Sequence, residues 1–228
     1  MTNKGNNQKL YWPPAVTVDV VIFTIENDQL KVLVIKRKKP PFEGSWALPG
    51  GFLARDESAK EGATRVLKEK TGIGRVYVEQ LYTFDSPHRD PRGHVISIAY
   101  FALVPRAKMI FGSGKKLQTP SLVPIKQLTK LAFDHKSILK YALQRLRYKL
   151  EYTNVAFSLL PKNFPFSQLQ RAYEIIWDKK LDKRNFRKKF LALGLIKPTK
   201  QKLAGSQHRP AQLHTFINKK PISLRRFF

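Results

Sequence analysis

The fold is decided by residues 51–73, which read GFLARDESAKEGATRVLKEKTGI. Four apolar residues in this stretch recur at the spacing of one helix face, namely Ala59, Ala63, Val66 and Leu67. This spacing predicts a helix from Ser58 to Thr71. Gly72 follows as its expected C-cap, because glycine readily takes the left-handed conformation that ends many helices.

Strand-like segments surround this helix. Alternating, β-branched runs at Ala15–Ile25 and Leu30–Arg37 predict a hairpin that turns at residues 26–28. Two further strands are expected at Val76–Phe84 and His94–Val104, on either side of a polar loop. Together these elements predict an α+β domain in which a mixed sheet carries an inserted helix.

The second half of the chain has the pattern of a different domain. Helical periodicity is present at Phe133–Tyr148 and Phe166–Trp177, and a third helix is expected from the N-cap Asp182 to about Leu193. An extended basic segment follows from Gly194 to Phe216. This order is typical of a winged helix-turn-helix. The expected divisions are a flexible N-terminus (1–12), an α+β domain (13–130), a winged helix (131–217) and a frayed basic tail (218–228).

The charge of the chain indicates a polyanionic partner. The formal net charge is +27, and residues 131–228 carry 22 Lys and Arg but only five Asp and Glu. Such a surplus favours nucleic acid, because basic side chains displace counterions from phosphates. The chain has no cysteine, its first residues resemble no signal peptide, and its most apolar stretch is too short to span a bilayer. We therefore expect a cytoplasmic protein that does not contact a membrane.

Residues 51–73 resemble the signature of the Nudix family, G-x5-E-x7-R-E-U-x-E-E-x-G-U, where U is aliphatic. Seven positions match in register, namely Gly51, Glu57, Arg65, Leu67, Glu69, Gly72 and Ile73. The resemblance implies a mixed sheet sandwiched by helices. It also implies that a charge pair between Glu57 and Arg65 braces the loop and the helix.

Two positions depart from this signature. The family is expected to hold divalent metal, usually Mg²⁺, with the first and last glutamates of the R-E-U-x-E-E segment, and these are Val66 and Lys70 here. Glu69 remains, and Glu61 is a possible substitute ligand, but two carboxylates rarely rebuild such a site. We therefore expect neither a metal cofactor nor catalytic residues, and no hydrolysis.

The loop at residues 84–94 is a candidate effector site. It contains Arg-Asp-Pro-Arg-Gly, which resembles relatives that handle ADP-ribose or nicotinamide nucleotides. Arginine side chains suit pyrophosphate oxygens without a metal. The expected contacts are Arg37, Arg89, Arg92 and His94. The alternative is that Asp90 and Arg92 pair only to order the loop.

The third helix of the second domain separates into two faces. Phe186, Phe190 and Leu193 fall on one face, and the polar face is expected to contact DNA through Lys183, Arg184, Asn185, Arg187 and Lys188. The alternative is a solvated cationic helix. His208 and Arg209 lie near the expected tip of the wing, where phosphates or the minor groove are contacted.

Residues from about 12 to 217 resemble one family, the Nudix-related transcriptional regulators of the NrtR type. Four stretches carry the resemblance, at residues 131–135, 142–150, 181–189 and 208–211. It implies a homodimeric repressor that binds a palindromic operator and responds to a small effector. In the best-known branch the effector is ADP-ribose and the genes serve NAD metabolism, whereas other branches sense sugars or their phosphates. The open alternatives are an active hydrolase of ADP-ribose-like substrates and a constitutive DNA-binding protein with a purely structural Nudix domain.

Overall fold

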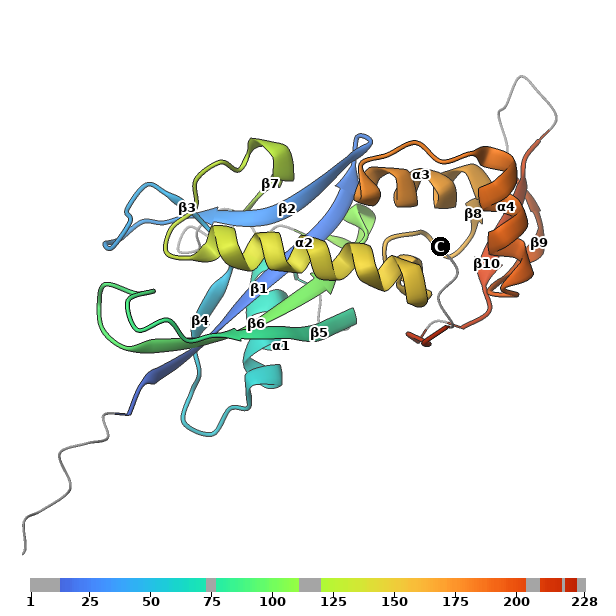
Figure 1. Cartoon of the computed structure of the whole chain (residues 1–228). Coiled ribbons are helices and arrows are strands. Elements are labelled where there is room, and N and C mark those ends of the chain that lie inside the picture. Colours follow the sequence, from blue (N-terminus) through green and yellow to red (C-terminus); the bar gives the residue numbers. More distant parts are fainter. Residues whose placement is uncertain (1–12, 73–76, 111–119, 204–209, 219, 225–228) are drawn as a thin grey trace, which may run out of the picture.

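The computed structural model describes residues 13–72, 77–110, 120–203, 210–218 and 220–224 (Figure 1). The first twelve residues and the candidates Ile73, His208 and Arg209 lie outside these ranges.

The chain begins with the expected hairpin. Strand β1 (Ala15–Glu26) pairs antiparallel with β2 (Gln29–Lys36). The turn residues Asn27 and Asp28 have φ values of 50° and 57°. Two consecutive left-handed residues make the tight turn whose twist matches that of the paired strands, and Asn and Asp tolerate this conformation better than most residues.

The hairpin belongs to a mixed sheet, as expected. Its order is β3-β2-β1-β6-β5, with β4 paired to β1 and β7 paired to β2. Strands β1 and β6 run parallel, and the other pairs are antiparallel. The additional strands are β3 (Trp46–Ala47), β4 (Gly50–Phe52), β5 (Tyr77–Phe84), β6 (Val95–Leu103) and β7 (Pro120–Pro124). Strands β3 and β4 were not predicted, because two or three residues show no periodicity.

A helix covers each face of this sheet (Figure 1). On one face, α1 (Ala59–Thr71) begins at the N-cap Ser58 and ends at Gly72, whose φ is 73°. It buries Ala63, Val66 and Leu67 against alternate residues of β1. On the opposite face, α2 (His135–Tyr152) buries Ile138, Leu139, Ala142 and Leu146 against the other set. The expected boundary at residue 130 therefore assigns to the second domain a helix that the structure packs on the sheet.

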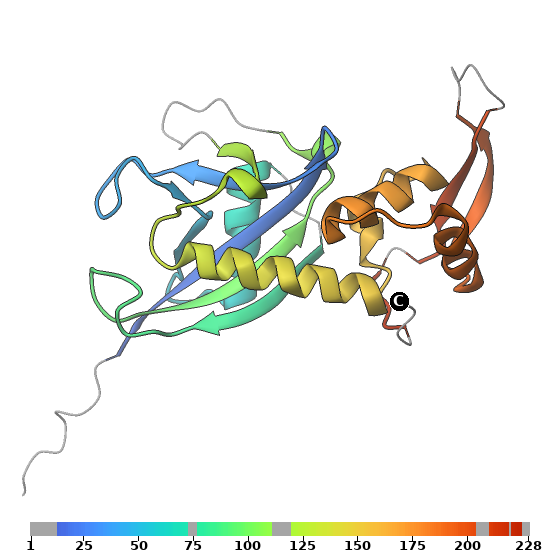
Figure 2. The same cartoon turned by 45° about the horizontal axis from the view of Figure 1, so that its top comes forward.

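The second domain has the expected winged-helix order. Helix α3 (Phe166–Trp177) is followed by α4 (Lys183–Ala192), and β9 (Ile196–Lys202) pairs with β10 (Gln212–Phe216). A short strand β8 (Phe164–Pro165) completes a three-stranded sheet. The core of this domain is continuous with the core under α2, so the two domains share one hydrophobic cluster. Helix α2 reaches from the sheet towards this domain (Figure 2). Among the described residues, no helix has the length and apolar character needed to cross a membrane.

The expectation of a frayed tail is wrong for residues 220–224. The buried Asn154 side chain donates to the backbone oxygens of Asn218 and Lys220 and accepts from the N–H of Ile222. The N–H of Leu224 also donates to the oxygen of Tyr152 at 2.7 Å. A buried amide needs such partners, and here the returning chain supplies them at the end of α2.

The pairing of β4 with β1 makes a testable demand on Gly50. A β-carbon at this position would lie 2.2 Å from Oδ1 of Asp19 and 2.7 Å from the oxygen of Val18. Gly50→Ala should therefore lower the free energy of unfolding by about 1–3 kcal/mol, the usual cost of overpacking, as measured by urea denaturation. The neighbouring Gly51 meets nothing within 4 Å, so Gly51→Ala should stay within about 0.5 kcal/mol of wild type. Equal losses in the two variants would contradict this account.

Candidate functional site

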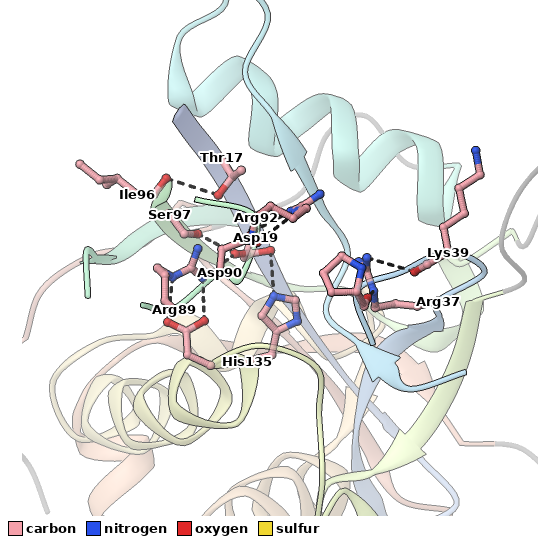
Figure 3. Close-up of polar contacts among 12 residues, drawn as sticks. Thr17, Asp19, Arg37, Lys39, Arg89, Asp90, Arg92, Ile96, Ser97 and His135 are labelled. Carbon is pink, nitrogen blue, oxygen red and sulfur yellow. Dashed lines mark hydrogen bonds and ion pairs between the residues drawn. The ribbon is translucent and has the colours of Figure 1, made fainter. Parts of the chain in front are cut away.

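A buried carboxylate on β1 organises the first candidate site (Figure 3). Asp19 accepts a hydrogen bond of 2.6 Å from the hydroxyl of Ser97 on β6. Nη2 of Arg89 lies 3.4 Å from its Oδ2, and Nε2 of His135 lies 3.4 Å from its Oδ1. Burial alone would raise the pKa of Asp19, but His135, Ser97 and Arg89 together lower it below the usual value. The group is therefore a carboxylate that joins two strands, a loop and a helix.

His135 occupies the first turn of α2 with a fixed orientation. Its Nδ1 accepts a hydrogen bond of 2.9 Å from the backbone N–H of Leu48. The other ring nitrogen, Nε2, faces the carboxylate of Asp19. His135 thus connects the loop before β4 with the buried carboxylate.

Arg89 also contacts the residue that precedes α2. Its Nε and Nη2 donate to the two carboxylate oxygens of Asp134, at 2.8 and 2.6 Å. Burial would lower the pKa of Arg89, but the hydrogen bonds to Asp134 raise it above its ordinary value. The side chain is only 3% exposed. Arg89 is thus placed against the predicted effector site with its guanidinium already occupied by two carboxylates.

A pocket of about 160 Å³ opens beside this network. Its wall brings together the predicted Arg37, Arg89 and Arg92, and adds the aromatic residue Phe52 and the loop residue Phe133. The guanidinium carbons of Arg37 and Arg92 lie 4.7 and 5.5 Å from the centre of the Phe133 ring. Arg92 also lies 5.3 Å from the ring centre of Phe52. Cations held over aromatic rings keep their edges available for anions.

Arg37 differs from the other two arginines of the pocket. It donates to the backbone oxygens of Pro41 and Lys39 and, in the described part of the chain, makes no ion pair with a carboxylate. Burial and then the nearby positive charge of Arg92 lower its pKa, while Asp90 opposes this shift. A cation in this position is stabilised by any anion that enters the pocket.

Arg92 pairs with Asp90, as the alternative for this loop predicts. Its Nε and Nη2 donate to Asp90 at 2.9 and 2.6 Å, so this pair does order the loop. Its side chain nevertheless remains 44% exposed at the pocket. His94 is exposed, and the pocket wall does not include it. Its role as an effector contact stays a prediction.

The second candidate site is the exposed face of α4. Lys183, Arg184, Asn185, Arg187 and Lys188 are all exposed, while Phe186 and Phe190 are buried. Asp182 accepts from the N–H of Asn185 at 2.8 Å and so caps the helix. The guanidinium of Arg187 lies 4.9 Å from the ring centre of Phe166, which fixes its stem on α3. The helix therefore presents a cationic face without an intervening carboxylate on that face.

Comparison with known proteins accounts for both sites. Residues 14–145 match the NUDIX domain model, and residues 156–216 match the NrtR DNA-binding winged helix domain model. An ADPR responsive transcriptional repressor of Acinetobacter baylyi is 40% identical over 215 residues, covering 92% of this chain and 85% of the relative. The chain belongs to the NrtR family of Nudix-domain transcriptional regulators.

Two further similar proteins have names or solved structures that concern the two sites. NrtR of Shewanella oneidensis, solved with a 27mer DNA, is 34% identical with a TM-score of 0.78, covering 88% of this chain and 93% of that one. Its isolated NUDIX domain, solved with ADP ribose, is 34% identical with a TM-score of 0.54, covering 64% and 99%. An ADP-ribose pyrophosphatase of Methanocaldococcus jannaschii is 43% identical over 132 residues, covering 58% of this chain and 75% of the relative.

The helix that carries the Nudix box of this family has the expected ion pair between Glu57 and Arg65. Arg65 donates to both carboxylate oxygens of Glu57, at 2.7 and 2.8 Å, and lies 3.5 Å from Glu69. Glu61 closes a capping box with Ser58 at the start of the helix. Val66 is buried in the core and Lys70 is half-buried. In the described ranges, no three His, Asp or Glu side chains are grouped to hold a metal ion.

Four residues of the first site were not predicted from the sequence, namely Asp19, Ser97, Asp134 and His135. One signal was present: Asp19 is the only charged residue in the apolar run VTVDVVIFTI, and a buried carboxylate requires partners. Its partners come from three distant segments, and a single sequence does not show which ones meet.

The Glu57–Arg65 pair predicts a pH-dependent part of the stability. Hydrogen bonds from Arg65 and from the N–H of Ala54 lower the pKa of Glu57 from 4.5 to about 2. The stabilisation is complete above pH 4.5 and is lost as the pH falls towards 2. Glu57→Gln should lower the urea midpoint at about pH 6, and its difference from wild type should shrink at about pH 3. Glu43→Gln, at an exposed glutamate, serves as the control, and a difference that does not change with pH would contradict the assignment.

Proposed function

We propose that this protein is an ADP-ribose-responsive transcriptional repressor. The winged helix binds operator DNA, and ADP-ribose binding to the Nudix domain releases it. The relatives from Acinetobacter and Shewanella support both halves of the proposal. The observation that carries it is the pocket in which Arg37 and Arg92 face one aromatic ring, in the same chain as the cationic face of α4.

The pocket suits a nucleoside diphosphate that is bound without a metal. Arg37 is the first choice for the diphosphate, because it has no carboxylate partner among the described residues and its pKa is lowered by burial and Arg92. Arg92 is the second, since its side chain is still 44% exposed beside Asp90. The exposed ring of Phe52 offers a stacking surface for a planar group such as adenine. Charge-assisted hydrogen bonds from guanidinium groups are the stronger kind, which favours this arrangement.

We further propose that the domain binds its ligand without cleaving it and without a metal cofactor. Val66 and Lys70 stand where the family signature has glutamates, and Glu61 is used in the capping box. Mg²⁺ needs several oxygen ligands with little distortion, and the remaining Glu57 and Glu69 both contact Arg65. Two carboxylates that share a guanidinium are poor ligands for a divalent cation.

On the DNA side, the proposal includes a homodimer on a palindromic operator. In a winged helix the recognition helix enters the major groove, where Arg and Lys read guanine and Asn reads adenine. Two copies of α4 related by a twofold axis then contact two half-sites. Such a protein acts on the chromosome in the cytoplasm, and genes of NAD metabolism are its proposed targets.

One second function has an observation in its favour. The pyrophosphatase of Methanocaldococcus jannaschii is 43% identical over the Nudix domain, so hydrolysis of ADP-ribose is the alternative. Release of AMP from ADP-ribose with Mg²⁺, abolished by Glu69→Gln, would show that the Nudix domain is a hydrolase and not only a sensor. Operator binding that no nucleotide changes would support a constitutive DNA-binding protein. A response to a sugar phosphate instead of ADP-ribose would mark a sugar-responsive regulator.

A reciprocal pair of variants tests the sensor. Arg37→Gln removes the unpaired charge of the pocket and should weaken ADP-ribose binding about 10–100-fold, with operator affinity unchanged. Arg184→Gln on α4 should weaken operator binding and leave ADP-ribose binding unchanged. Calorimetry measures the nucleotide, and fluorescence anisotropy measures upstream DNA. The assignment of the two sites is wrong if either variant affects the other ligand to the same extent.

The cationic face of α4 predicts a specific dependence on salt. Lys188→Ala should lower affinity for operator and unrelated DNA alike, and should reduce the slope of log affinity against log salt by about one. The control is Lys68→Ala on α1, an exposed lysine of the Nudix domain, which should leave the slope unchanged. A slope unaffected by Lys188→Ala would remove this residue from the phosphate contacts.

A further inference from the structure

Arg89 lies in the loop of the proposed effector site, but its guanidinium pairs with the carboxylate of Asp134. Its side chain is 3% exposed, and two of its nitrogens are used by the carboxylate of Asp134. The same guanidinium lies 3.4 Å from Asp19. A ligand phosphate that took Arg89 would leave one buried carboxylate and one half-buried carboxylate without their cation, which is unfavourable. Arg37 and Arg92 carry no such constraint from α2.

The Arg89–Asp134 pair fixes the start of α2. Asp134 occupies the N-cap position, but its side chain makes no capping hydrogen bond and faces Arg89 instead. The next residue, His135, is held by Leu48 and Asp19. Phe133, directly before Asp134, carries the ring that Arg37 and Arg92 face. The first turn of α2 is therefore attached to the pocket through three consecutive residues.

The other end of α2 is attached to the DNA-binding domain. Nε of Arg147 donates to the oxygen of Ile176 at 2.9 Å, and Nε1 of Trp177 donates to the oxygen of Arg147 at 3.2 Å. Tyr173 of α3 in turn packs on Phe186 of α4. With 18 residues, α2 is about 27 Å long, and Figures 1 and 2 show it running from the sheet to α3. Helix α2 thus connects the pocket to the helix that supports α4.

The interface between the two domains, called the seam here, is partly open. A cleft of about 400 Å³ lies between the β1–β2 turn, α2 and α3. Its rim is bridged by the pairs Arg171–Asp28 at 3.2 Å and Lys126–Asp178 at 2.8 Å. All four side chains are at least 37% exposed, and exposed ion pairs resist separation only weakly.

We propose that Arg89 is a positioning residue that couples the pocket to the DNA-binding domain through Asp134 and α2, without contacting the effector. This inference rests on the proposed function and adds to it the route by which the effector acts. Effector engagement of Arg92 shifts the loop that also carries Arg89. The Arg89–Asp134 pair passes this shift to α2, and α2 reorients α3 and α4 across the seam.

The test uses the full chain with Arg89→Lys and, separately, Asp134→Asn. Calorimetry with ADP-ribose measures binding, and anisotropy on operator DNA with and without ADP-ribose measures the response. Both variants should keep ADP-ribose affinity and nucleotide-free operator affinity within about threefold of wild type, while the nucleotide no longer weakens operator binding. Asp134→Asn keeps the test decisive if the buried Arg89 variant misfolds, because the Asp134 side chain is partly exposed and its change disturbs the core less. Arg106→Lys, in the pair with Glu26 at the far end of β1 from Asp19, is the matched control and should respond as wild type does.

Each result decides the matter. Loss of ADP-ribose binding in the two variants would make Arg89 an effector ligand and overturn the inference. Retention of the full response in both would also overturn it, because the pair would then carry no coupling. A wild-type protein that ignores ADP-ribose would overturn the proposed function, and the coupling would fall with it. If the wild type responds to ADP-ribose but the variants do not behave as expected, the coupling is overturned and the proposed function stands.

Discussion

The structure depends on one buried carboxylate, that of Asp19 in the centre of a strand. A charge removed from water costs several kcal/mol unless hydrogen bonds and opposite charge compensate it. Here the partners are a hydroxyl from β6, a guanidinium from the loop after β5 and an imidazole from α2. Gly50 belongs to the same constraint, because a side chain there would displace the carboxylate. One charge thus holds in register four segments that are distant in sequence.

This constraint also determines which arginines remain available. Arg89 is used by Asp19 and Asp134, and Arg92 is partly used by Asp90. Among the described contacts, Arg37 donates to backbone oxygens and lies over an aromatic ring but forms no ion pair, which leaves its charge available to a ligand. The three arginines of the pocket are therefore not three equivalent phosphate contacts. The role of each side chain depends on whether a carboxylate pairs with it.

The fold was more predictable from sequence than the site. The β1–β2 hairpin, α1 with its C-cap Gly72, α3 and α4 follow from local spacing and turn chemistry, and all are confirmed. The Glu57–Arg65 pair followed from the family signature and is present. What local patterns do not contain is the meeting of Asp19, Arg89 and Asp134, which depends on the sheet order. The placement of α2 on the sheet was missed for the same reason, since an apolar stripe does not reveal which surface covers it.

The position of α2 gives physical meaning to the combination of the two domains. An enzyme needs only its own pocket, and its appended domain can be joined by a loose linker. In this chain α2 buries its apolar face against the sheet at one end and contributes to the core of the winged helix at the other. The two domains consequently share one hydrophobic cluster and cannot shift independently of that helix. A pocket next to the first turn of such a helix has the arrangement that a sensor requires.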